Sequence, residues 1–244
     1  MERLSIAALH AMKREARKIV GVVAWDYQIA QIADRAGVDL ISVGDSVGVN
    51  LWGHATDTEV TVEEMLVCCK AVRRGAKRAL VSCDVPHGPV NAGADATVRA
   101  ALRLAQEGGA EMVKVLGDPG VVRAIVKAGV PVFAEFHGDS LPVDELVDEA
   151  KRLQDAGASV LDFRHSGPVA GPAVVRAVSI PVIGGLGGGP WLDGRVRLAH
   201  TAIGYAAKWI DAKTETYGNA AKLSLDALRA LIDDVRSGRQ IRGG

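Results

Sequence analysis

The chain has 244 residues with 29 basic and 29 acidic side chains, so no net field attracts nucleic acid or an anionic membrane. Apolar residues make up 48% and aromatic residues only 4%, so small side chains must fill the interior. No apolar run approaches the roughly 18 residues of a membrane span, and residues 1–17 lack the apolar core of a signal peptide. Cys68, Cys69 and Cys83 follow no zinc or C-x-x-C spacing, which favours a reducing, cytoplasmic location.

Short apolar segments alternate with amphipathic helical segments along the chain, and glycines separate many of them. The elements expected in the first half are, in order, a helix at 5–17, a strand at 18–23, a helix at 27–36, a strand at 39–43, a helix at 61–75, a strand at 78–84 and a helix at 94–107. Those expected in the second half are a strand at 112–116, a helix at 121–128, a strand at 130–136, a helix at 143–156, a strand at 159–164, a helix at 171–178, a strand at 180–184, a weaker strand at 197–203 and a closing amphipathic helix at 223–236.

This alternation predicts an α/β fold of the (β/α)8 TIM-barrel type, as a single domain over residues 1–244. A doubly wound sheet is the alternative, but no G-x-G-x-x-G follows the first strand, which disfavours its dinucleotide-binding form. Thr61 and Glu64 have the spacing of a capping box at the start of a helix. The connection at 47–60 is long and is a candidate lid over a site.

Two apolar strands end in carboxylates. Asp45 and Ser46 follow the strand at 39–43, and Asp84 ends the next strand along the chain. The carboxyl ends of parallel barrel strands meet at one mouth, so Asp45 and Asp84 are candidate ligands of a hard cation. Helix capping is the alternative role for both aspartates. Lys114 lies within the apolar strand at 112–116, where a solvated surface lysine is not expected.

Several stretches resemble the ketopantoate hydroxymethyltransferase family of the isocitrate lyase and phosphoenolpyruvate mutase superfamily. They lie at 43–48, 60–65, 70–76, 84–86, 112–114, 179–184 and 189–194. The resemblance implies a (β/α)8 barrel, a divalent cation, usually magnesium, and a ring-like homo-oligomer. It also implies condensation of 3-methyl-2-oxobutanoate with the one-carbon unit of methylenetetrahydrofolate. In that chemistry a base takes the C3 proton, and the cation stabilises the enolate of the chelated 2-oxo acid.

The resemblance assigns roles to four retained residues. Asp45 and Asp84 match the metal ligands, and Ser46 matches a residue that contacts the substrate carboxylate, although a turn hydroxyl is its alternative. Lys114 matches the active-site lysine, which is expected to neutralise the bound oxo acid or to donate to a developing oxyanion.

Three positions depart from the family pattern. Leu116 replaces a glutamate that helps to hold the metal, Glu135 replaces a histidine, and Arg164 replaces the glutamate proposed as the base. Strands five and six are neighbours, so one hypothesis is that Glu135 serves as base or metal ligand while Arg164 binds a second anionic group. A structural ion pair between Glu135 and Arg164 is the alternative. Asp162 shares the strand parity of Arg164 and is expected to orient it.

His137 and His165 are expected to face the helices or to lie in loops, with catalysis as the alternative. The glycine-rich segment at 184–190 follows strand seven, where backbone amides of barrels often approach an anion; a flexible loop is the alternative.

The predicted activity is metal-dependent aldolase-type hydroxymethyl transfer to 3-methyl-2-oxobutanoate or an analogue. The changes at 135 and 164 leave open a specialised paralogue with another 2-oxo acid or another one-carbon donor. One alternative is cleavage, decarboxylation or hydrolysis of a 2-oxo or 2-hydroxy diacid. The other is a non-catalytic barrel that binds a metabolite, which Leu116 and Arg164 favour and the retained Asp45, Asp84 and Lys114 disfavour.

Overall fold

The computed structural model describes residues 3–139, 141–211, 216–241 and 243. The chain divides into two compact units, residues 1–197 and 198–244. None of the described helices combines the length and the apolar character needed to cross a bilayer. The single domain expected over 1–244 stays a prediction.

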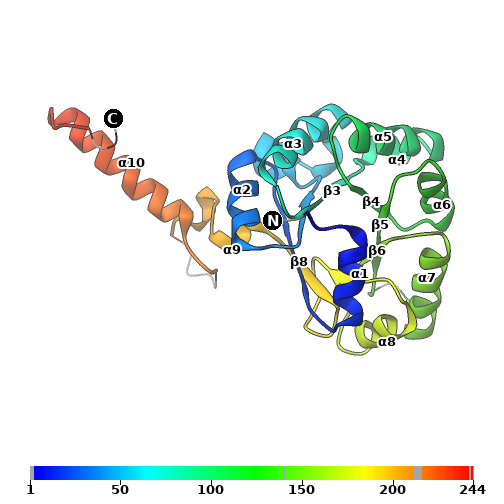
Figure 1. Ribbon diagram of the computed structural model, residues 1–244. Helices are drawn as coiled ribbons and strands as arrows, with labels where there is room; N and C mark the ends of the chain where they lie inside the picture. The colour runs from blue at the N-terminus through cyan, green and yellow to red at the C-terminus, as the bar shows by residue number, and fades with distance from the viewer. Residues whose placement is uncertain (1–2, 140, 212–215, 242, 244) are drawn as a thin grey trace. The chain divides into compact units, whose positions relative to one another are not determined.

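Eight parallel strands close into a barrel in the order of the chain (Figure 1). They are β1 (Ile19–Val23), β2 (Leu40–Val43), β3 (Leu80–Asp84), β4 (Met112–Leu116), β5 (Val132–His137), β6 (Val160–Arg164), β7 (Val182–Gly184) and β8 (Gly194–Leu198). Each pairs in parallel register with its successor, as in Asp84 opposite Lys114 and Glu135 opposite Asp162. The predicted (β/α)8 barrel is therefore confirmed.

In the first unit, the helices that follow the strands cover the outside of the barrel, and the helix that precedes β1 packs against its amino end (Figure 1). Those of the first unit are α1 (Ile6–Arg14), α2 (Tyr27–Ala36), α3 (Val62–Gly75), α4 (His87–Asn91), α5 (Ala94–Gln106), α6 (Pro119–Lys127), α7 (Val143–Asp155) and α8 (Ala170–Ala177). The second unit contains α9 (Ala199–Ile203) and α10 (Ala220–Arg236). The Thr61–Glu64 capping box opens α3 as predicted, because each side chain binds the other residue's backbone amide.

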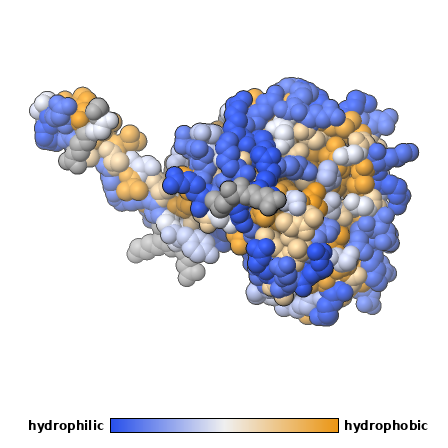
Figure 2. All heavy atoms as spheres, in the orientation of Figure 1, coloured by the Kyte–Doolittle hydropathy of each residue, from blue (hydrophilic) through white to orange (hydrophobic). Residues whose placement is uncertain are grey.

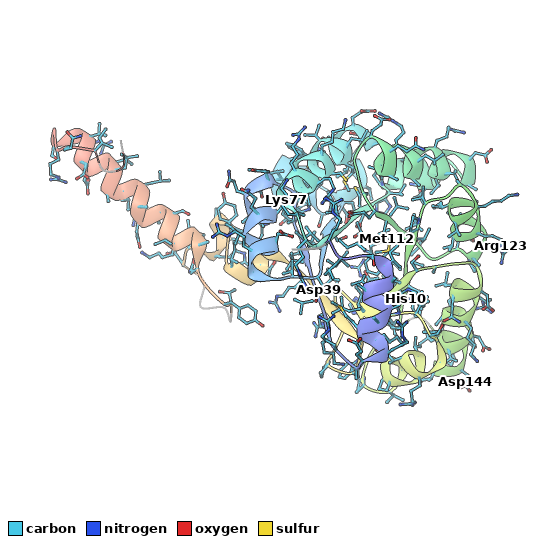
Figure 3. All side chains as sticks on the ribbon, in the orientation of Figure 1. His10, Asp39, Lys77, Met112, Arg123 and Asp144 are labelled. Carbon is cyan, nitrogen blue, oxygen red and sulfur yellow. The ribbon has the colours of Figure 1, made fainter. Side chains whose placement is uncertain are left out.

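The barrel interior is apolar at its amino end. Leu9 and Met12 of α1 are fully buried against residues near the amino ends of the strands, including Leu40 and Met112. Figure 3 places Met112 within the barrel and Arg123 and Asp144 on the outer helices. Figure 2 shows hydrophilic side chains over much of that outer surface. Helix α1 thus closes the amino end, and polar chemistry is left to the carboxyl ends of the strands.

Cys68, Cys69 and Cys83 are free and buried. Burial raises the pKa of the Cys68 thiol to about 12, so it stays protonated and unreactive near neutral pH.

The prediction for the last strand was wrong. The segment expected at 197–203 is instead the end of β8 followed by α9, and β8 begins at Gly194. A Cβ at position 194 would lie 2.1 Å from the carbonyl oxygen of Ile19, so only glycine lets β8 close against β1. That requirement arises from barrel closure and leaves little trace in local periodicity. The closing helix is confirmed as α10, which begins three residues earlier than expected, after the N-cap Asn219.

Candidate active site

Lys114 is the centre of a charged cluster at the carboxyl ends of the barrel strands. Its Nζ lies 2.5 Å from Glu135 Oε2, 3.2 Å from Asp162 Oδ2 and 3.7 Å from Asp84 Oδ2. Burial alone would lower the pKa of the ammonium, but these three carboxylates hold that pKa well above its usual value. Lys114 is therefore a permanent cation inside the barrel, held by strands β3, β5 and β6.

Glu135 is bound through both carboxylate oxygens. Oε2 pairs with Lys114, while Oε1 accepts hydrogen bonds from Arg164 Nη1 at 2.7 Å and from His137 Nε2 at 3.0 Å. Burial would raise the pKa of Glu135, but the two cations outweigh it and lower the pKa to about 2. A carboxylate so fully paired is a poor proton acceptor and a poor metal ligand, which favours the ion-pair interpretation of Glu135 and Arg164.

The expectation for His137 was wrong. Residues 135 and 137 are two apart in one strand and therefore point to the same face, and the His137 imidazole binds Glu135 rather than facing a helix. The even spacing of residues 135 and 137 was the feature of the sequence that could have predicted this contact. His165 follows β6 in a left-handed backbone conformation, with a φ of 51°, and its side chain is exposed. Its ring centroid lies 6.3 Å from that of His137.

Asp162 makes its contacts away from Arg164. Its Oδ2 pairs with Lys114, and its Oδ1 accepts a hydrogen bond from the Gly185 amide at 3.0 Å. The Gly185 amide of the glycine-rich loop at 184–190 thus already binds a carboxylate of the protein. Leu116 ends β4 with a side chain that is 62% exposed, so this position offers only apolar surface at the mouth.

Asp84 is the last residue of β3 and is buried beside Lys114. Its Oδ1 lies 3.5 Å from the Ser42 hydroxyl that donates to it. Burial is the main cause that raises the pKa of Asp84 to about 7; nearby carboxylates, Asp45 among them, add to it, and Lys114 opposes it. Burial likewise raises the pKa of Asp45, which lies in the turn after β2. Both carboxylates would be stabilised by additional positive charge.

Sequence reasoning missed Asp57 and His87 as neighbours of Asp45. One ligand atom from each of the three residues lies within 4.8 Å of the others, and His87 Nε2 is 3.6 Å from Asp45 Oδ2. Asp57 comes from the short helix η2 (Asp57–Glu59) in the connection at 47–60, and His87 opens α4 after β3. Both follow barrel strands at their carboxyl ends, which was the available signal. Carboxylate oxygens with an imidazole form a donor set that suits a divalent cation.

Gly44 has no side chain, and this leaves space between the Ser46 hydroxyl and the Asp84 carboxylate. A Cβ at position 44 would lie 2.9 Å from Val23 Cγ1 and 3.1 Å from Ser46 Oγ, and 3.7 Å from Asp84 Oδ2. The Trp25 indole donates to the Gly44 carbonyl at 3.0 Å and holds the turn. The turn therefore brings the Ser46 hydroxyl to the same end of the barrel as Asp84.

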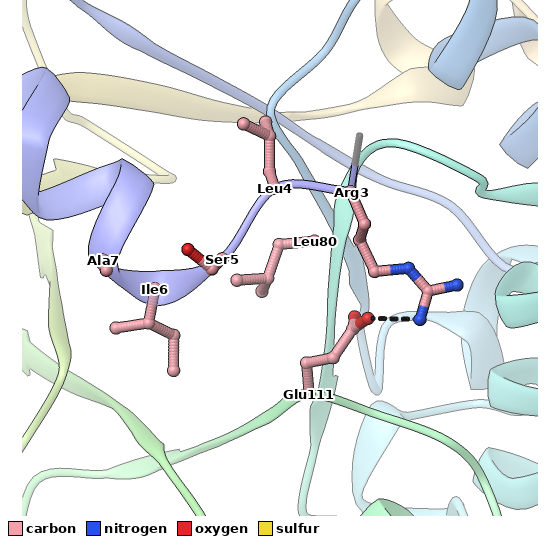
Figure 4. A pocket seen from close by; sticks show the side chains of 7 residues that line it. All are labelled: Arg3, Leu4, Ser5, Ile6, Ala7, Leu80 and Glu111. Carbon is pink, nitrogen blue, oxygen red and sulfur yellow. Dashed lines mark ion pairs between the residues drawn. The ribbon is translucent and has the colours of Figure 1, made fainter. Parts of the chain in front are cut away.

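A separate pocket of about 500 Å³ lies at the opposite end of the barrel (Figure 4). Its wall includes Leu80, the first residue of β3, and an ion pair of 3.2 Å between Arg3 and Glu111. Because β3 ends at Asp84, this pocket belongs to the amino end and not to the charged cluster.

A closed parallel barrel with carboxylates and a lysine at the carboxyl ends of its strands defines the class of (β/α)8-barrel enzymes. The family model described as ketopantoate hydroxymethyltransferase matches residues 3–138 and 136–240. The chain is 34% identical to the 3-methyl-2-oxobutanoate hydroxymethyltransferase of Geobacillus kaustophilus, over 92% of this chain and 87% of the relative. It is 31% identical to the enzyme of the same name from Trichlorobacter lovleyi, over 97% and 96%. This chain belongs to the ketopantoate hydroxymethyltransferase family.

Solved structures share the fold at lower identity. A phosphonopyruvate hydrolase in complex with oxalate and Mg²⁺ has a TM-score of 0.64 and 17% identity, over 96% of this chain and 88% of that one. A 2,3-dimethylmalate lyase of the phosphoenolpyruvate mutase and isocitrate lyase superfamily has a TM-score of 0.63 and 15% identity, over 95% and 87%. These likenesses support the barrel fold.

Proposed function

We propose that this protein catalyses hydroxymethyl transfer to 3-methyl-2-oxobutanoate or a close analogue, in the cytoplasm, with methylenetetrahydrofolate as the one-carbon donor. The observation that carries the proposal is the Lys114 ammonium, buried among three carboxylates at the barrel mouth of a chain of this family. A buried cation at this position is suited to a substrate that carries a carboxylate and develops an oxyanion.

Asp45 and Asp84 are the proposed ligands of a divalent cation, with magnesium the expected ion. Burial and neighbouring carboxylates raise the pKa values of both carboxyls, which means that their ionised forms are disfavoured. A bound cation would stabilise the ionised forms. When bound, the cation would supply Lewis-acid polarisation of the keto group.

The chain's own groups orient the substrate. The Lys114 ammonium offers hydrogen bonds to the substrate's carboxylate or keto oxygen, and the Ser46 hydroxyl offers one to the carboxylate. Lys114 is held from three strands, so its position is set before substrate binds, which is the preorganisation that makes such a cation effective.

The test follows the C3 proton of 3-methyl-2-oxobutanoate by NMR in deuterated water with Mg²⁺. The protein should exchange this proton for deuterium and, once methylenetetrahydrofolate is added, form the hydroxymethylated product. Failure of exchange with 3-methyl-2-oxobutanoate and with a panel of other 2-oxo acids would overturn the proposal.

Asp57 and His87 are predicted to assist metal binding through their position beside Asp45. Asp57→Asn and His87→Gln should each weaken Mg²⁺ binding by about 10- to 100-fold, as loss of a supporting group at a metal site commonly does. Isothermal titration calorimetry measures this, with Asp95→Asn on the exposed face of α5 as the matched control. Unchanged affinity in both variants would remove these residues from the site.

A reaction on a 2-oxo diacid is the second candidate, and Arg164 favours it. Among the described residues the one side-chain hydrogen bond of Arg164 goes to Glu135, and 30% of its side chain is exposed at the end of β6. The remaining guanidinium donors are suited to a second carboxylate. Product analysis with 2-oxo diacids, in the absence of any one-carbon donor, separates this candidate from hydroxymethyl transfer.

Self-association is a further prediction, and α10 supports it. Its exposed apolar side chains include Leu228, Ile232 and Val235, at spacings of four and three residues, and Figure 2 shows apolar surface along this helix. Light scattering after size exclusion should give a mass above that of one chain, and Leu228→Glu should lower it. Arg229→Glu, one position along the same helix, is the control and should leave the mass unchanged. A wild-type mass of one chain would refute the prediction.

A further inference from the structure

Enolisation of a 2-oxo acid requires a base. In the charged cluster Asp84 is a proposed metal ligand, and Asp162 is bound by Lys114 and by the Gly185 amide. Lys114 and Arg164 are cations whose pKa values are raised, and Glu135 is an anion whose pKa is lowered to about 2. Arg164 occupies the position that the family resemblance assigns to the base. The group that accepts the C3 proton must therefore lie elsewhere at the mouth.

His137 has the geometry of a positioned base. It is the last residue of β5, two residues beyond Glu135, and so lies about 7 Å further toward the mouth on the same strand face. Its Nε2 is 3.0 Å from Glu135 Oε1, and 35% of its side chain is exposed, so a substrate can reach it. Arg164 is its register partner on β6.

The carboxylate that holds His137 is itself fixed from both sides. Lys114 on β4 binds Oε2 of Glu135, and Arg164 on β6 binds Oε1. An imidazole bound to a fixed carboxylate keeps one orientation, and the carboxylate stabilises the imidazolium that forms when a proton is taken. Two strands on either side of β5 thus build the support for a single histidine.

The other histidines at this end of the barrel are not bound to a carboxylate of the cluster around Lys114. His54 pairs instead with Glu64, at the start of α3, at 3.2 Å. His87 lies beside Asp45, in the proposed metal site. His165 is exposed after β6; its ring is near that of His137, and its backbone amide binds the Leu186 carbonyl. The groups near His137 include Glu135 on its own strand, Arg164 on β6 and His165 in the segment after β6.

We propose that His137 is the catalytic base of this protein and that Glu135 is the residue that positions it. This proposal rests on the enolisation of a 2-oxo acid stated above. The C3–H bond breaks and an N–H bond forms on the imidazole. The electron pair of the C3–H bond enters the C2–C3 double bond, and the negative charge moves to the keto oxygen. In deuterated water the imidazolium exchanges its proton and returns a deuteron to C3.

The test measures C3 deuterium exchange of 3-methyl-2-oxobutanoate with Mg²⁺ in the wild type, His137→Gln and His137→Ala. Exchange should fall by about 100-fold or more in both variants, the usual contribution of a general base. Calorimetric binding of the oxo acid should stay within about threefold, because a base adds little to ground-state affinity. Added imidazole should raise the exchange rate of the alanine variant, which a purely structural role would not permit.

The matched control is His165→Asn, because asparagine also tolerates the left-handed backbone at position 165. It should keep the wild-type exchange rate. Retained exchange in the His137 variants, equal loss of exchange and of oxo-acid binding, or no response to imidazole would each overturn the role of His137. Absence of exchange in the wild type would instead overturn the proposed function, so the two failures are distinct.

Discussion

A Lys114→Met variant is expected to lose both activity and much of its stability at neutral pH. Methionine keeps the length of the side chain but leaves Asp84, Glu135 and Asp162 facing one another without their shared cation. Removal of one partner from a buried ion pair costs about 3–5 kcal/mol of unfolding free energy. Loss of the oxyanion-stabilising cation should lower the rate of C3 proton exchange by about 100-fold or more.

The stability loss should depend on pH in a defined direction. In the wild type Glu135 has a lowered pKa, from 4.5 to about 2, so its contribution is complete above 4.5 and is lost as pH falls through 2. In Lys114→Met, protonation of the crowded carboxylates reduces their mutual repulsion. The loss of unfolding free energy relative to the wild type should therefore be larger at pH 7 than at pH 4. Urea unfolding at the two pH values measures this.

Lys127→Met is the matched control for that experiment, since Lys127 is exposed at the end of α6. It should change the unfolding free energy by less than about 0.5 kcal/mol. A Lys114→Met protein as stable as the wild type at pH 7 would contradict the central role assigned to the ion cluster.

Asp84→Asn is expected to stabilise the metal-free protein while it removes metal binding. The pKa of Asp84 is raised from 3.8 to about 7, so folding favours the protonated carboxyl and stability declines as pH rises from 3.8 through 7. Asparagine does not ionise and avoids this decline. At pH 8 and without metal the variant should be more stable by about 2–4 kcal/mol, because each tenfold change in proton affinity on folding corresponds to roughly 1.4 kcal/mol.

Magnesium should reverse that order. It should raise the melting temperature of the wild type at pH 8, because a ligand that binds the folded state alone stabilises it. It should leave the melting temperature of Asp84→Asn nearly unchanged, and this variant should lose C3 proton exchange. Asp95→Asn serves as the control, with wild-type responses throughout. Equal magnesium stabilisation in Asp84→Asn would remove Asp84 from the metal site.

Much of the site could be predicted because its members end strands. Asp84, Lys114, Glu135 and Arg164 each lie at or near the carboxyl end of an apolar run, and parallel strands bring those ends together. The departures at Leu116, Glu135 and Arg164 were also visible from residue type alone. The contacts of these residues could not be predicted from residue type. Lys114 is 21 residues from Glu135 in the chain, and their pairing depends on strand order and register.

The sequence by itself determined the alternation of strand and helix, the glycine ends of helices and the polar residues at strand tips. These features follow from propensity and periodicity over short segments. Only the tertiary structure decided that His137 binds Glu135, that Asp57 and His87 lie beside Asp45, and that β8 begins at Gly194. Each of these depends on how closure of the barrel brings distant segments within a few ångströms, and that distance is a property of the whole fold and not of any one segment.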